Sequence, residues 1–116
     1  MNAAEMRSRL ACYGADLEGI EDRFMGDMEL YETCLHLFCD DKHFGQMENA
    51  FAEGNVQAAF SAAHALKGVA GNLGLTPLYV TMCGVVETLR YAKSCEGISE
   101  KMAEIALQRE RMRELL

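Results

Sequence analysis

An apolar stripe at helical spacing in the middle of the chain constrains the fold most strongly. Between residues 59 and 73, apolar side chains recur every three or four positions, at Ala59, Ala62, Leu66, Ala70 and Leu73. At about 100° per residue, these positions fall on one side of an α-helix, as in a helix that packs against a core. No segment of the chain alternates polar and apolar residues with a period of two, so no β-sheet is expected.

The same periodicity, with residues that typically begin and end helices, predicts the remaining elements. We expect helices over residues 3–13, 27–54, 55–73, 76–97 and 99–116, and a short amphipathic turn over residues 17–24. Thr76 is expected to be an N-cap, because Pro77 follows it at the first helical position. All connections are short, which favours an antiparallel up-and-down four-helix bundle with an additional short N-terminal helix. The fold class is therefore predicted to be all-α.

Length and composition limit the class of protein further. At 116 residues the chain is expected to form one domain, residues 1–116. Its formal net charge of −7 disfavours nucleic-acid partners, because phosphate backbones attract basic surfaces. No apolar run approaches the roughly 20 residues of a membrane span, and the N-terminus lacks the pattern of a signal peptide. Five cysteines without a CxxC pair indicate free thiols, so we expect a cytoplasmic protein.

His64 is predicted to lie on the side of the 55–73 helix that faces solvent, nearly opposite Leu66. Residues that share its side are Gln57, Phe60, Ser61, Lys67, Gly68 and Gly71. A glycine inside a helix costs about 1 kcal/mol relative to alanine, so the two glycines weaken this helix. We interpret them as a bare surface that lets another protein approach the imidazole. The alternative is that they seat a neighbouring helix of the same bundle.

The segment His64-Ala65-Leu66-Lys67-Gly68, followed by Gly71, Gly74 and Leu75, resembles the signature of histidine-containing phosphotransfer (HPt) domains. These domains are the four-helix carriers of two-component phosphorelays. Gly26-Asp27 ahead of a helix, and residues 50–55 leading into the histidine helix, follow the same layout. The resemblance covers most of the chain, and the last helix is its least diagnostic part.

The resemblance implies a function and partners. His64 would accept a phosphoryl group from the aspartate of a response-regulator receiver domain, become phosphohistidine, and pass the group to another receiver. The implied partners are receiver domains and a hybrid sensor histidine kinase, and the chain is expected to be a monomer. It has no Walker-type loop, kinase motif or acidic Mg²⁺-binding cluster. It is therefore expected to be a phosphotransfer intermediate rather than an enzyme, without a cofactor, with Mg²⁺ on the receiver.

The residues around His64 suit this chemistry. A neutral imidazole nitrogen is a nucleophile near neutral pH. Lys67, at i+3, can place its ammonium beside the oxygens of a phosphoryl group and stabilise their charge. The partner is expected to dock on the surrounding surface, at Gln57, Phe60, Ser61, Gly68 and Gly71.

A hydrogen-bonding side chain on the following helix steadies the imidazole in many HPt domains. An ungapped count places Val86 at this position, with Glu87 beside it. Valine cannot form the hydrogen bond. Either Glu87 substitutes through a small change of helical phase, or the support is absent.

Three other functions are compatible with parts of the sequence. His36, Asp40 and His43 recur at i, i+4 and i+7, and Cys39 precedes His43 by four residues, so a metal-binding helical bundle is one alternative. A receiver-binding adaptor that does not transfer phosphate is another, although the presence of His64 and Lys67 argues against it. An enzyme with His64 as base or nucleophile would need a pocket and an orienting partner, which the sequence does not indicate.

Overall fold

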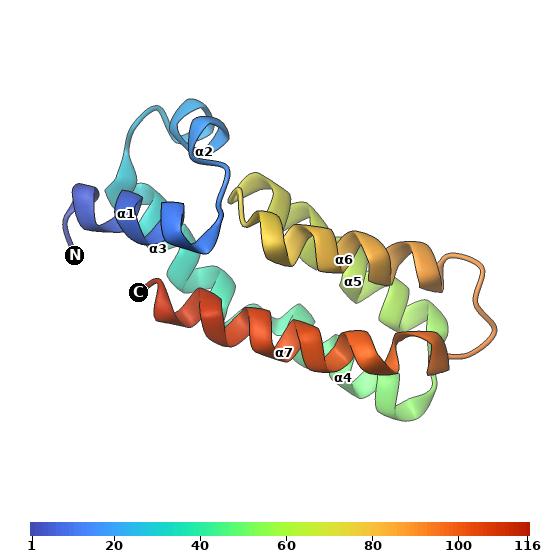
Figure 1. The fold of residues 1–116 in the computed structure, drawn as a ribbon. Coiled ribbons are helices and arrows are strands. Elements are labelled where there is room, and N and C mark those ends of the chain that lie inside the picture. The colour runs from blue at the N-terminus through green and yellow to red at the C-terminus, as the bar shows by residue number, and fades with distance from the viewer.

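The computed structural model describes residues 1–116 and contains helices only, which confirms the all-α class (Figure 1). In chain order the elements are α1 (Ala3–Tyr13), α2 (Leu17–Phe24), α3 (Met28–Cys39), α4 (Lys42–Glu53), α5 (Val56–Asn72), α6 (Thr76–Leu89), the 3₁₀ turn η1 (Glu96–Ile98) and α7 (Ser99–Glu114). None of these helices is long and apolar enough to cross a membrane.

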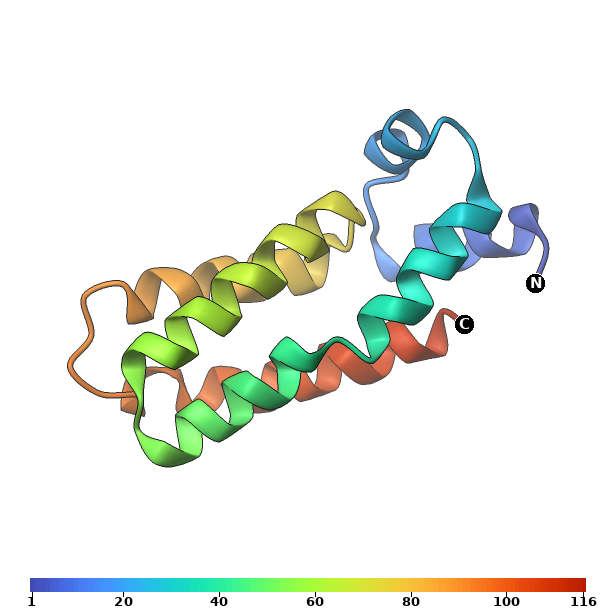
Figure 2. The same ribbon diagram turned by 180° about the vertical axis from the view of Figure 1, so that it is seen from behind.

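Helices α4, α5, α6 and α7 form an antiparallel four-helix bundle (Figures 1 and 2). The molecule is elongated, with principal extents of 45 × 20 × 20 Å. Helix α3 extends the line of α4 beyond the bundle, and α1 packs beside α3 near the end of α7. Helix α2 lies close to the turn that joins α5 to α6. The predicted bundle is therefore present, with more helix at its N-terminal end than the sequence pattern suggested.

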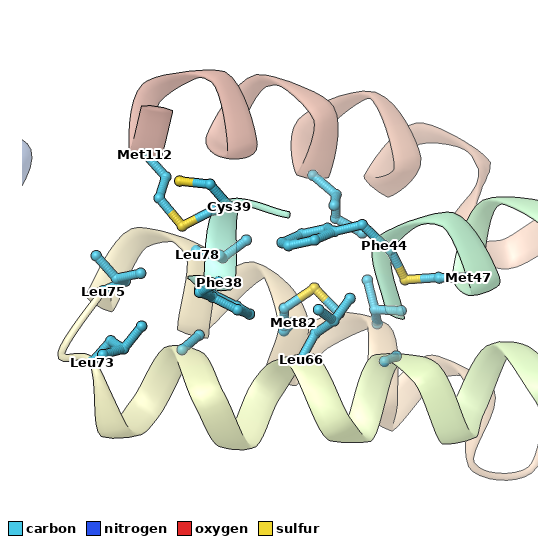
Figure 3. Packing of buried hydrophobic residues seen from close by; sticks show 14 of the residues in the cluster. Phe38, Cys39, Phe44, Met47, Leu66, Leu73, Leu75, Leu78, Met82 and Met112 are labelled. Atoms are coloured by element: carbon cyan, nitrogen blue, oxygen red, sulfur yellow. The ribbon is translucent and has the colours of Figure 1, made fainter. Parts of the chain in front are cut away.

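The interior of the molecule is one cluster of 28 buried apolar residues. All five residues of the apolar stripe on α5 belong to it, as their spacing predicts. Figure 3 shows Leu66 and Met82 directed toward Phe38 and Phe44, whose ring centroids are 5.4 Å apart. Because burying one leucine contributes about 1.5–3 kcal/mol, this stripe holds α5 with its opposite side toward solvent.

Side chains at the predicted positions start most helices. The carboxylate of Asp27 accepts a hydrogen bond from the backbone N–H of Leu30 at the start of α3. The amide oxygen of Asn55 accepts one from the N–H of Ala58 at the start of α5. Each of these bonds satisfies an N–H group that the helix itself leaves without a partner. Gly54 ends α4 in the left-handed conformation, with φ of 70°.

The single helix predicted over residues 27–54 is wrong, because it is divided at Asp40 and Asp41. The Asp41 carboxylate accepts a hydrogen bond from the N–H of His43 and begins α4. Aspartate side chains compete for backbone hydrogen bonds in this way, so they favour a cap over a helix interior. The carbonyl of Cys39, at the end of α3, accepts hydrogen bonds from the guanidinium of Arg109 on α7. This contact between distant segments stabilises the break.

Both predicted ends of the 76–97 helix also differ from the structure. Thr76 is the first residue of α6 rather than its N-cap, and Leu75 at the cap position has no side-chain hydrogen bond to offer. Pro77 in the first turn fixes the start of the helix instead. The helix ends at Leu89, before Gly97, and a loop leads to Ile98, which is fully buried. Burial of this side chain draws the connection back onto the bundle.

Candidate functional site

His64 lies exposed near the middle of α5, on the side opposite the buried stripe. Its closest aromatic neighbour is Phe60, one turn earlier on the same helix. The two ring centroids are 6.0 Å apart and the ring planes are inclined by 31°. Contact with Phe60 limits the directions that the imidazole can take while its outer edge remains open to a partner.

The guanidinium of Arg90, at the C-terminal end of α6, lies beside Phe60. Its Cζ atom is 5.6 Å from the centroid of the Phe60 ring, a separation at which cation–π attraction contributes about 0.5–1 kcal/mol on an exposed surface. The Glu87 carboxylate accepts a hydrogen bond of 3.4 Å from the Arg90 guanidinium. Sequence reasoning missed Arg90, and the antiparallel pairing of α5 with α6 is the signal that could have found it.

The pairing of α5 with α6 also shows which residue of α6 lies opposite the imidazole. Gly71 meets Tyr79 at one end of the two helices, and Phe60 meets Arg90 at the other. Antiparallel helices pair in opposite order, so Val86 lies across from His64. Val86 is 1% exposed and has no polar group, and the Glu87 side chain is 73% exposed and bonded to Arg90. No side chain on α6 donates a hydrogen bond to His64, and Phe60 provides its only aromatic contact.

Lys67 follows His64 by three residues and is half-buried. At about 100° per residue it falls on the same side of His64 as Phe60 and Gly71, which face α6. Its ammonium takes part in none of the four salt bridges of the structure. The positive charge is thus not neutralised within the chain. An incoming phosphoryl group on His64 would meet this cation one helical turn away.

The two glycines near His64 have different surroundings. A Cβ atom on Gly68 would have nothing within 4 Å, so this part of the helix is bare. A Cβ atom on Gly71 would lie 3.2 Å and 3.3 Å from ring carbons of Tyr79 on α6. Gly71 therefore seats a neighbouring helix of the same bundle, and the interpretation of both glycines as bare surface is wrong for this one. Gly68 remains the open approach to the imidazole.

The other residues of the predicted docking surface lie on two sides of His64. Gln57 and Ser61 are exposed, and Phe60 is half-buried. Ser61 lines a groove between α4 and α5 together with His43 and Glu53, whereas Phe60 faces α6 and Arg90. A partner that covers all of them would have to span the ridge of α5.

Charge is distributed unevenly around the site. Of the 29 Lys, Arg, Asp and Glu residues, only Lys67 falls within residues 54–86, which span α5 and most of α6. Glu87 follows near the end of α6, so the two helices together are neutral in a chain whose net charge is −7. An acidic partner therefore meets a cation beside His64 and no carboxylate within residues 54–86.

Two of the alternative functions, the metal-binding bundle and the enzyme, find no support in this geometry. Helix α3 ends at Cys39, so His36, Asp40 and His43 do not share one helical face, and the spacing argument for a metal site is wrong. Nowhere do three His, Cys, Asp or Glu side chains come together in a way that could hold a metal ion. His64 lines none of the hollows of the surface, so the pocket that an enzyme acting through this residue would need is not seen around it.

Comparison with known proteins gives one family. Residues 37–116 match the family model described as the Hpt domain, which is more than half of the chain. The matched segment begins within α3 and includes the whole four-helix bundle with His64 and Lys67. Searches of curated proteins and of solved structures found no match.

Proposed function

Because the chain belongs to the Hpt domain family, we propose that it carries a phosphoryl group on His64 from one receiver aspartate to another. Hpt domains are phosphocarrier modules of two-component systems rather than classical enzymes, and they act with receiver domains. The observation that carries the assignment to this residue is the exposed imidazole on a ridge of α5, with Lys67 one turn away and bare backbone at Gly68.

The transfer needs only a positioned nucleophile from this chain. The unprotonated ring nitrogen of His64 attacks the phosphorus of the receiver's aspartyl phosphate, while the other ring nitrogen keeps its proton. A P–N bond forms as the P–O bond breaks, and the aspartate leaves as a carboxylate with the bonding electron pair. In the reverse direction, a carboxylate of the next receiver attacks the phosphorus and the imidazole leaves. We assign the divalent cation that shields the phosphoryl oxygens to the receiver.

Lys67 and Arg90 are expected to have different roles, because they lie at different distances from the imidazole. The Lys67 ammonium is placed to approach the phosphoryl oxygens directly, which stabilises each unit of charge by about 1 kcal/mol at 4 Å in water. Arg90 is one contact further away, because the Phe60 ring separates it from the imidazole. We therefore expect Arg90 to orient Phe60 and to attract the receiver, and Lys67 to affect the transfer step itself.

Docking brings the receiver to the imidazole. Gly68 has no side chain to hold the partner away, and the exposed side chains of Gln57 and Ser61 can form polar contacts at the margin. We further propose that a hybrid sensor histidine kinase supplies one of the receivers, and that residues 1–116 act as a monomeric unit.

Transfer of labelled phosphate from a phosphorylated receiver domain to the protein tests this proposal. We expect the label to appear on the wild-type chain, to be lost in acid and to survive alkali, as a P–N bond does. His64→Gln should take up no label. His36→Gln is the matched control, because it removes another exposed histidine of the same chain, and it should behave like the wild type. Uptake of label by His64→Gln would show that the acceptor is another residue.

Phosphoramidate, a small donor that does not dock, separates the nucleophile from the partner surface. Its phosphoryl group moves to the imidazole as ammonia leaves. Labelling of His64 by phosphoramidate without transfer from any of several receivers would favour the receiver-binding adaptor over the carrier.

A further inference from the structure

The surface that continues from His64 toward the α5–α6 turn is apolar and almost free of charge. We call it the α5–α6 face and define it by Lys67, Gly68, Gly71, Tyr79 and Cys83. Tyr79 is 36% exposed on this face, and its neighbour Val80 is 62% exposed. Interfaces are depleted of charged residues at their centre and enriched in tyrosine, because burying an ion costs hydration that an aromatic ring does not lose.

The packing of α5 against α6 sets the position of the Tyr79 ring. The absence of a side chain at Gly71 lets the ring lie directly against α5, with carbons 3.2 Å and 3.3 Å from where a Cβ would be. Gly71 follows His64 by seven residues, which is about 10 Å along a helix. A typical interface covers about 800 Å² on each partner, or a disc of roughly 16 Å radius. One partner centred near His64 would therefore cover Tyr79 as well.

A hollow beside the Tyr79 ring adds shape to this face. Its lining includes Gly71, Gly74, Leu75 and Thr76, together with the exposed carboxylate of Asp16 at the start of α2. The hydrogen bond with Cys83 raises the pKa of Tyr79. The hollow and the ring together offer an apolar concave contact for a protruding side chain.

The opposite side of His64 is less suited to an acidic partner. The groove between α5 and α4 is lined by the carboxylate-bearing Glu53 as well as by His43 and Gln46. Asp16 lines the hollow beside Tyr79 as Glu53 lines this groove, so the carboxylates alone do not distinguish the two sides. The difference is the cation, because a positive charge attracts a phosphorylated, acidic site. The α5–α6 face instead presents the Lys67 cation, and Arg90 lies further along the same pair of helices.

We propose that the receiver docks over the α5–α6 face, with Tyr79 as its apolar anchor and Lys67 toward its phosphorylated aspartate. This inference rests on the proposed function and adds the direction from which the receiver approaches. The partner that fits carries an apolar patch about 10 Å from its aspartyl phosphate. The interface with the receiver then extends from His64 over α6 and not over α4.

Three variants test the anchor. Tyr79→Ala removes the ring, Tyr79→Phe keeps the ring and removes the hydroxyl, and Leu107→Ala truncates a side chain that is 46% exposed on α7. Each variant is phosphorylated in parallel by a receiver domain carrying labelled aspartyl phosphate, at concentrations below saturation, and by phosphoramidate. Far-ultraviolet circular dichroism verifies that the helices are intact.

We expect Tyr79→Ala to lower the rate of transfer from the receiver by about tenfold, as loss of an interface hot spot does. Tyr79→Phe and Leu107→Ala should transfer at the wild-type rate, and all variants should react equally with phosphoramidate. Receiver transfer to Tyr79→Ala at the wild-type rate would overturn the docking direction and leave the phosphocarrier proposal in place. Failure of the wild type to take phosphate from the receiver would refute both, whether or not phosphoramidate labels His64.

Discussion

The difference between Gly68 and Gly71 leads to a sharp prediction about stability. A Cβ on Gly68 meets nothing within 4 Å, and the residue has helical backbone in the interior of α5. Gly68→Ala should therefore gain the full propensity difference, about 1 kcal/mol in the free energy of unfolding. For a chain of this length that corresponds to a rise of roughly 4 °C in Tm.

Gly71→Ala is the matched comparison, because the same residue change is made one turn later on the same helix. Its new methyl group would lie 3.2 Å from the Tyr79 ring, so the ring must move by a few tenths of an ångström. Displacing this partly exposed ring offsets the gain in propensity, and we expect Gly71→Ala to be less stable than Gly68→Ala by about 1 kcal/mol.

Urea unfolding followed by circular dichroism at 222 nm measures both changes in the free energy of unfolding. The comparison requires that the slope of this free energy against urea concentration be the same for the wild type and the two variants. Equal stabilisation by the two substitutions would show that Tyr79 does not constrain Gly71. A loss of stability in Gly68→Ala would refute the open surroundings at Gly68. The bulkier Gly68→Gln should keep most of the gain in stability and yet block transfer from a receiver, which would separate the role of this glycine in docking from its effect on folding.

Other predictions concern charge, a buried hydrogen bond and thiol reactivity. Lys67→Ala should slow transfer from a receiver about fivefold, because loss of about 1 kcal/mol of charge stabilisation corresponds to that factor. Its control, Lys42→Ala, removes an exposed lysine of α4 and should leave the rate unchanged. Tyr31→Phe should lower the free energy of unfolding by about 1–3 kcal/mol in urea titrations. The buried Tyr31 hydroxyl donates a hydrogen bond of 2.6 Å to the carbonyl of Leu73, the C-cap of α5, and its removal leaves this carbonyl without a partner. An unchanged urea midpoint would contradict this. Burial raises the pKa of the Cys39 thiol, so iodoacetamide at neutral pH should alkylate exposed Cys12 well before Cys39, as mass spectrometry of partly modified protein would reveal.

Much of the fold could be predicted from sequence because its signals are local. The caps at Asp27 and Asn55 are contacts between residues three apart, and the stripe on α5 is a periodicity within one helix. The same periodicity directs His64 away from the core. The break at Asp40 and Asp41 was missed because its residues fit both a helix interior and a cap, and the contact that favours the break comes from Arg109.

The sequence by itself determined the all-helical class, most of the helices, the side of α5 on which His64 lies and the family to which the chain belongs. These follow from the 3.6-residue period and from a motif confined to one helix. Only the tertiary structure decided that Gly71 seats Tyr79 while Gly68 stays bare, that Arg90 reaches Phe60, and that Val86 leaves the imidazole without a hydrogen bond from α6. Each of these depends on the register of α5 against α6, which is set by how two buried surfaces fit together and not by the preferences of either helix alone.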